Sequence, residues 1–233
     1  MIGVVVNTAT VLLGSTIGML LKKAIPKKIT DAVMIALGLC TIYIGISGAL
    51  EGTNTIVAII SMVLGTAIGT AIDLDKHLNS LGDKIGRKFK GGSQGGAIAQ
   101  SFVTGSLLFC VGAMTIVGGL KAGLEGDNEL YFTKAIMDFI SSMMLSVSLG
   151  IGVVFSSAFV FVFQGAIVLL SGALAPVLSD TAIAQITCVG SLMIIALGLN
   201  LIGIAKLKVA NFLPALILAP IALAIYDWIA AMF

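Results

Sequence analysis

The segment IMDFISSMMLSVSLG (136–150) places an aspartate and four serines inside an apolar run. Wound as an α-helix at roughly 100° per residue, it carries its polar side chains on one face and its large apolar side chains on the other. The polar face consists of Lys134, Asp138, Ser141, Ser142, Ser146 and Ser148. In a membrane such a face must lie against protein or water, so further helices have to surround it.

The rest of the chain is too apolar for a protein dissolved in water. Of its 233 residues, 58% are hydrophobic and 10% are charged, whereas soluble domains average about 25% charged residues. The 28 glycines suit the close packing of membrane helices. The composition predicts an all-α polytopic membrane protein whose main partner is the lipid bilayer, and a net charge of +2 gives no reason to expect nucleic acid.

Eight segments have the length of about 17 to 25 residues that a helix needs to cross a bilayer. They are 1–21, 33–50, 55–73, 98–120, 134–154, 158–175, 182–204 and 209–231. Together they predict a single transmembrane domain, 1–233, with a hydrophilic loop at 74–97. By the positive-inside rule, the basic linkers 22–28, 74–97 and 204–208 face the cytoplasm, and both termini then lie outside.

The run 134–175 leaves the number of spans open. Its roughly 42 residues would measure about 63 Å as one helix, twice the thickness of the hydrocarbon core. The chain must therefore turn near Gly150, Gly152 or Ser156–Ser157. If the first half were re-entrant instead, seven spans would result, but the basic segment 204–208 would then face outward. The charge distribution favours eight.

Pairs of segments repeat a pattern of glycines. GxxxG occurs at Gly14/Gly18 and at Gly65/Gly69, and a wider, equal spacing occurs at Gly38/Gly45 and Gly105/Gly112. Inverted repeats of helices, with a site near the bilayer midplane, are a common construction of secondary transporters. GxxxG faces also serve helix packing within a chain or between chains, so a homodimer is compatible with them.

Three segments resemble one bacterial family. They are GVVVNTATVLLGSTIGMLLKK (3–23), GSLLFCVGAMTIVGGLKAGLEGDNELYFTKAIMDFISSMMLSVSLGIGV (105–153) and KVANFLPALILAPI (208–221). The family is that of uncharacterised inner-membrane proteins of the YdfK and YqgA type. The resemblance covers essentially the whole chain and implies a multi-pass protein of the bacterial cytoplasmic (inner) membrane. It implies no substrate, so function has to be inferred from the residues.

Polar side chains within the spans predict a site for a small ion or solute. The expected site residues are Asp138, Ser141, Ser142, Ser148, Asn7, Asn200 and Asn211. In this hypothesis the carboxylate binds a coupling cation or a proton, the hydroxyls assist it, and the amides reach one common cavity from three other spans. Glycines and prolines that interrupt the later spans would free backbone carbonyls near it.

This pattern favours a secondary transporter or channel that is coupled to a cation or to protons. The alternative is a non-transporting membrane scaffold or accessory subunit that packs through its GxxxG faces. In that case Asp138 serves only as the ion-pair partner of Lys134, four residues before it.

Signatures of catalysis and of metal binding are absent from the sequence. It contains no Walker motif, HExxH or GxSxG, and its three cysteines lie singly in apolar segments. We therefore expect no enzymatic activity, no cofactor and no metal site. A lipid-directed intramembrane enzyme would have to use Asp73, Asp75 and His77, a cluster that is more typical of a solvated turn.

Overall fold

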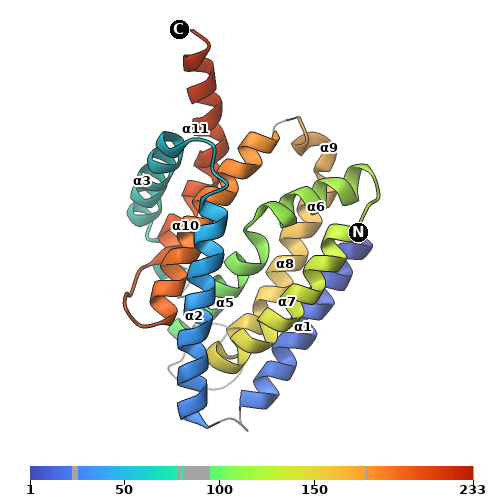
Figure 1. Ribbon diagram of the computed structural model, residues 1–233, viewed down its shortest axis with the longest axis vertical. Coiled ribbons are helices and arrows are strands. Elements are labelled where there is room, and N and C mark those ends of the chain that lie inside the picture. Colours follow the sequence, from blue (N-terminus) through green and yellow to red (C-terminus); the bar gives the residue numbers. More distant parts are fainter. Residues whose placement is uncertain (23–25, 78–79, 81–94, 177, 233) are drawn as a thin grey trace.

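The computed structural model describes residues 1–22, 26–77, 80, 95–176 and 178–232, and helices make up most of this part of the chain (Figure 1). They are α1 (Ile2–Lys22), α2 (Lys27–Ala49), α3 (Thr55–Ala71), α5 (Gly95–Cys110), α6 (Ala113–Leu124), α7 (Glu129–Leu149), α8 (Gly152–Leu169), α9 (Ser171–Leu174), α10 (Asp180–Leu201) and α11 (Pro214–Ala230), with the short 3-10 helix η1 (Val209–Phe212) before α11. The predicted loop 74–97 lies mostly outside the described residues.

Six helices among the described residues are long and apolar enough to cross a membrane, and the bent pair formed by α5 and α6 makes a seventh if it counts as one span. Helix α3 has 17 residues and a length of about 25 Å, slightly less than the roughly 30 Å of a hydrocarbon core. The protein is therefore an all-α polytopic membrane protein. Of the eight expected spans, the one at 55–73 therefore stays a prediction.

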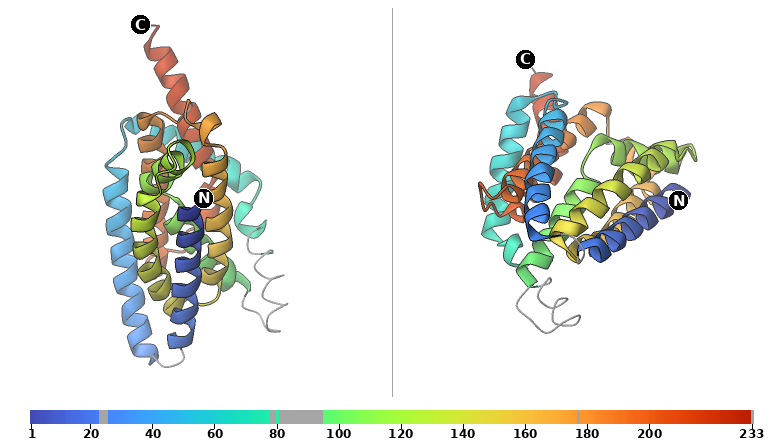
Figure 2. Two further views of the ribbon diagram at one scale, coloured as in Figure 1. Left: turned by 90° about the vertical axis from the view of Figure 1, so that its right-hand side faces the viewer. Right: turned by 60° about the horizontal axis from the view of Figure 1, so that its bottom comes forward.

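The chain reverses direction between successive long helices, so basic and acidic connections lie at opposite ends (Figures 1 and 2). Lys22, Lys206 and Lys208 belong to one end, whereas Glu51 and the linker 125–129 belong to the other. Both termini lie away from the basic end. This distribution agrees with the orientation that the positive-inside rule predicts.

The run 134–175 forms two helices that both qualify as spans. Helix α7 ends at Leu149 and α8 begins at Gly152, separated by Gly150 with φ +86°. A glycine adopts this left-handed backbone without the steric penalty of a side chain. Helix α7 also begins earlier than the predicted 134, at Glu129, so Asp138 lies at the middle of its helix rather than one turn from the end.

The span predicted at 98–120 is not one continuous helix. The helical segments Ala97–Cys110 and Met114–Leu124 meet at an angle of 59°. Gly112, between them, has φ +135°, a conformation that side-chain-bearing residues rarely adopt. The sequence offered several glycines in this region and no means of telling which of them interrupts the helix.

The helices form two groups that α5 connects (Figure 2). One group contains α1, α6, α7 and α8, and the other contains α2, α3, α10 and α11. Apolar side chains of α5 pack into both, with Phe109 in a cluster with Val11 and Leu145, and Val103 in a cluster with Met193 and Leu197. This division leaves room for a cavity between the groups.

Both GxxxG motifs are used for packing inside the chain. A Cβ atom at Gly14 or Gly18 would collide with the backbone carbonyl of Phe139 or Met143 on α7, and one at Gly69 would collide with the carbonyl of Asn211 in η1. Glycine thus allows α1 to approach α7, and α3 to approach η1, at backbone distance.

We expect Gly18→Ala to destabilise the protein in detergent by about 1–3 kcal/mol, because the new methyl group meets a backbone carbonyl that cannot turn away. The matched control is Gly172→Ala in α9, where a Cβ would have no neighbour within 4 Å. Thermal unfolding of both variants tests this packing. Equal unfolding temperatures would show that α1 does not lie this close to α7.

Candidate functional site

A buried ion pair lies at the middle of α7. The Lys134 Nζ is 3.0 Å from Oδ1 of Asp138 and 2.9 Å from Oδ2, and the two side chains are only 9% and 7% exposed. Four residues of helix bring both side chains to the same face, which makes the pair local in origin. The ion pair that the sequence suggested therefore forms, but in the interior of the protein.

Two amides from other helices complete the arrangement. Asn7 on α1 donates from Nδ2 to Oδ2 of Asp138 at 3.1 Å, and from the same nitrogen to Oε1 of Gln164 on α8 at 3.2 Å. All four residues are buried. Among the described residues, Asn7 Oδ1 and Gln164 Nε2 have no hydrogen-bond partner. The carboxylate is thus held by the amide of Asn7, which Gln164 in turn contacts, and by the ammonium of Lys134.

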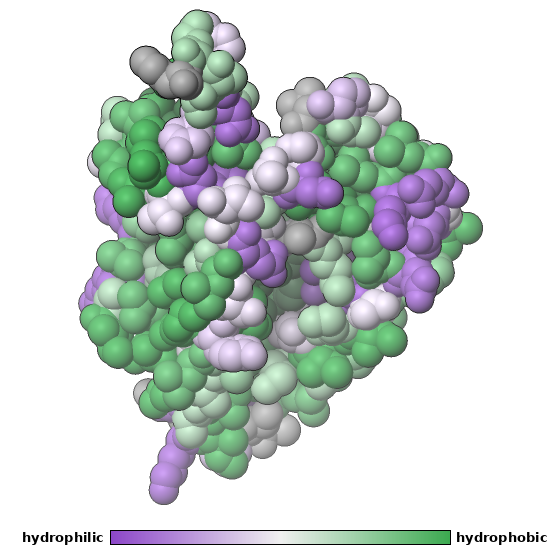
Figure 3. Space-filling view, turned by 45° about the horizontal axis from the view of Figure 1, so that its top comes forward, coloured by the Kyte–Doolittle hydropathy of each residue, from purple (hydrophilic) through white to green (hydrophobic). Residues whose placement is uncertain are grey.

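The ion pair borders a cavity of about 510 Å³ between the two groups of helices. Its lining comes from α2, α5, α6, α7 and α10, and it is mostly apolar. Its charged lining residues are Glu51, Lys134 and Asp138, and its hydroxyl-bearing ones include Thr41, Ser47, Ser141, Thr187 and Ser191. Figure 3 views the molecule from the end opposite the basic end. It shows a hollow between the two groups of helices, with hydrophilic side chains at its edges.

The break between α5 and α6 forms part of the cavity wall, through Val111, Gly112 and Met114. Thr115 links the two half-helices, since its backbone amide donates to the carbonyl of Gly112 and its Oγ1 donates to that of Phe109. Tyr131 on α7 donates to the carbonyl of Thr115 at 3.0 Å. The interruption is thus fixed by specific hydrogen bonds, and it brings the end of α5 and the start of α6 to the wall of the cavity.

Of the three predicted serines, only Ser141 lines the cavity beside Asp138. Ser142 is buried against Gly14 of α1 and donates to the carbonyl of Phe139, so it serves helix packing. Ser148 lies near the basic end of α7, where its carbonyl accepts a hydrogen bond from Lys22. The polar stripe therefore divides between the cavity and the interface with α1.

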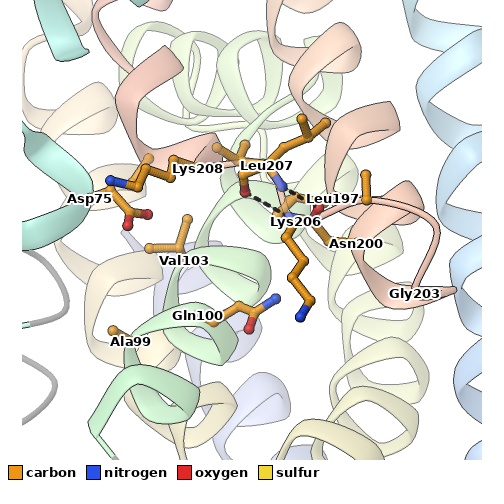
Figure 4. A pocket seen from close by; sticks show the side chains of 13 residues that line it. Asp75, Ala99, Gln100, Val103, Leu197, Asn200, Gly203, Lys206, Leu207 and Lys208 are labelled. Atoms are coloured by element: carbon orange, nitrogen blue, oxygen red, sulfur yellow. Dashed lines mark hydrogen bonds between the residues drawn. The ribbon is translucent and has the colours of Figure 1, made fainter.

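Asn200 and Asn211 do not join Asp138. Asn200 closes the turn after α10, donating to the carbonyl of Leu207 and accepting from its amide, both at 2.8 Å (Figure 4). Asn211 accepts from the backbone amide of Asp75 at 2.8 Å and so ties η1 to the segment after α3. The expectation that four spans bring these amides to one cavity is wrong for Asn200 and Asn211. Asn200 binds the backbone of Leu207 instead, and Asn211 binds that of Asp75.

Asn200 lines a separate pocket of about 490 Å³ at the basic end, which shares no residue with the Asp138 cavity. Lys206 points into this pocket toward Gln100, and Lys208 lies on the side of Asp75 (Figure 4). Lys208 is also 3.8 Å from Asp73, in a largely exposed ion pair. The turn that carries Asp73 and Asp75 thus interacts with the loop before η1.

Several contributors to the site were missed in the sequence. The residues expected from the sequence do not include Gln164, Glu51, Thr187 or Ser191, although these lie on the network or line the cavity. For Gln164 a signal existed, because an amide within an apolar span needs a hydrogen-bond partner. The hydroxyls and Glu51 had no such signal, because only tertiary packing brings α2 and α10 to α7.

We expect Lys134→Met to lower the stability of the protein by about 3–5 kcal/mol, since it leaves Asp138 ionised, buried and without its main partner. The double variant Lys134→Met/Asp138→Asn should regain most of this loss, because it removes both charges and keeps a hydrogen-bonding amide beside Asn7. Unfolding of the parent, both single variants and the double variant gives the coupling energy. Additive effects would contradict a direct pair.

Comparison with known proteins places the chain in a family. The model of a family described as "Protein of unknown function (DUF554)" matches residues 2–224. The chain is 30% identical over 227 residues to "Uncharacterized membrane protein YdfK" of Bacillus subtilis (strain 168), covering 96% of each chain. It is 30% identical over 233 residues to "Uncharacterized protein YqgA" of Escherichia coli (strain K12), covering 98% of this chain and 99% of the relative. No solved structure matches. The chain belongs to the DUF554 family of proteins, as the resemblance in its sequence indicated.

Proposed function

We propose that the protein is a secondary transporter or channel for a small ion or solute, coupled to a cation or to protons, with its site at Asp138. The observation that carries this proposal is the position of the carboxylate. It lies at the middle of a candidate span, in the wall of a cavity between two groups of helices. Ionisable groups at such depth are costly in a membrane and are characteristic of substrate and ion pathways.

The interrupted helix beside the carboxylate supports the same proposal. In secondary transporters, sites near the midplane are commonly built from discontinuous helices whose free backbone ends take part in binding. Here α5 ends and α6 begins at the wall of the cavity that contains Asp138. The scaffold alternative accounts for the ion pair of Lys134 and Asp138 but gives no role to the interrupted helix beside a cavity.

The arrangement of the helices gives this site a means of opening. The cavity has α7 and α6 of one group on one side and α2 and α10 of the other group opposite. In our proposal the two groups move relative to each other around α5, which exposes Asp138 to one side of the membrane at a time. Alternating access by rocking of one bundle against another follows the same principle.

The scaffold alternative draws no support from the GxxxG motifs. Both motifs face partners inside the chain, with Gly18 against α7 and Gly69 against η1. They are therefore not free to bind a second protein, and a homodimer formed through them is not favoured either. That the protein forms a homodimer stays a prediction, and no surface of the protein is assigned to this contact.

We expect one or more ligands to stabilise the purified protein in detergent, and this stabilisation to vanish in Asp138→Asn. The screen is thermal unfolding against a panel of inorganic cations, small metabolites and pH values. A ligand at about 100 times its dissociation constant should add roughly 2.7 kcal/mol. Asp75→Asn is the matched control, because Asp75 lines the separate pocket at the basic end.

Two results would count against the proposal. One is a panel without any ligand whose effect depends on Asp138. The other is a ligand whose effect disappears in Asp75→Asn and persists in Asp138→Asn, which would place the binding site at the basic end.

A further inference from the structure

The Asp138 carboxylate already binds a primary ammonium, that of Lys134. The Lys134 Nζ contacts both carboxylate oxygens, at 3.0 and 2.9 Å. It sits at the end of a flexible four-carbon stem, and both residues line the cavity. The structure therefore shows that the carboxylate accepts a primary ammonium. The cavity beside it is the space from which another ammonium could enter.

The carboxylate has a hydrogen-bond donor besides Lys134. Asn7 donates to Oδ2 at 3.1 Å, and Gln164 holds Asn7 through the same amide nitrogen at 3.2 Å. Neither amide lines the cavity, so both act from behind the carboxylate. One donor to the carboxylate would therefore remain if the ammonium left.

The groups around the carboxylate favour an organic ammonium over a metal ion. Its contacts are N–H donors, and Oε1 of Gln164 already accepts from Asn7. A hard metal ion needs about six oxygen ligands, whereas an ammonium needs acceptors for three N–H groups. The described residues also hold no group of three or more His, Cys, Asp and Glu side chains suited to a metal.

The rest of the cavity suits the body of a small amine. A volume of about 510 Å³ lies within the usual range of small-ligand sites, about 300–1,000 Å³. Phe109, Met114, Met137 and Ile194 are among the apolar lining residues. The charged lining residues comprise two carboxylates and one ammonium, and Glu51 offers a second acceptor for a displaced lysine.

We propose that the cavity binds a small protonated primary amine with an apolar body, whose ammonium takes the place of Lys134 on Asp138. Lys134 is then a tethered competitor that closes the empty site and turns toward Glu51 when the ligand enters. No covalent bond changes, and the number of charges in the site rises by the one positive charge that the ligand brings. This inference gives the chemical class of the solute and rests on the proposed transport function.

The test uses the full-length protein in detergent, with n-butylamine as the probe. Thermal unfolding is titrated with n-butylamine, with n-butanol as its uncharged counterpart and with tetramethylammonium as a cation without N–H donors. We expect saturable stabilisation by the amine alone, and its loss in Asp138→Asn. A tethered group competes at an effective concentration in the millimolar range, so Lys134→Met should bind the amine at least about tenfold more tightly.

Two further variants keep the test decisive if Lys134→Met fails to fold. Lys134→Arg retains an ion pair with Asp138 and offers a planar, two-point donor that is a stronger competitor, so the amine should bind at least about tenfold more weakly. Lys121→Met removes an exposed lysine at the end of α6, outside the cavity lining, and should leave the affinity unchanged.

The outcomes separate this inference from the function on which it rests. Equal stabilisation by n-butanol or tetramethylammonium, amine binding that persists in Asp138→Asn, or an unchanged affinity in both Lys134 variants would overturn the inference. If amines fail while another ligand acts through Asp138, the transporter proposal stands and the amine is excluded. If no ligand of any class acts through Asp138, both are overturned.

Discussion

The structure depends on one requirement, which is that a carboxylate at the middle of a membrane helix must be neutralised and hydrogen-bonded. Lys134 supplies the neutralising charge, and Asn7 supplies the further hydrogen bond. Asn7 can reach Asp138 only because α1 lies against α7 at backbone distance, which the glycines at 14 and 18 allow. The packing of small residues and the satisfaction of a buried charge are therefore parts of one arrangement, in which the glycines position the amide that the carboxylate needs.

The network of Lys134, Asp138 and the amides is electrically neutral, and in the proposed transporter this has a consequence for ligand binding. One positive and one negative charge form the pair, and the two amides around it carry none. The unfavourable transfer of an isolated charge into a membrane interior is thereby avoided while the site is empty. In the proposed transporter, a cation that enters would have to rearrange this pair, which would link binding to a conformational change through electrostatics. Glu51 is a second carboxylate in the lining of the same cavity.

Sequence patterns predicted the parts of this protein that local rules determine. Composition and length gave the membrane class and most of the helices, and a helical projection brought Lys134 and Asp138 together because both lie on one helix. Asn7 was selected because an amide in an apolar span requires a partner. Patterns failed where the backbone conformation of a connection decides the outcome, because residue types alone do not determine it. Asn200 satisfies its amide on Leu207 within its own turn, and Gly112, among many glycines, is the one that takes a positive φ between α5 and α6.

The two GxxxG motifs show that the same sequence pattern can have different structural roles. Gly18 and Gly69 each meet a backbone carbonyl, of Met143 and of Asn211 respectively. The first contact belongs to a helix pair that carries the ion pair, whereas the second fixes the 3-10 helix η1 beside the basic end. Small residues only permit a close approach, and the polar groups beside them decide what the approach is used for. In α1 that group is Asn7, which explains why the hydrogen-bond network around Asp138 lies between α1, α7 and α8.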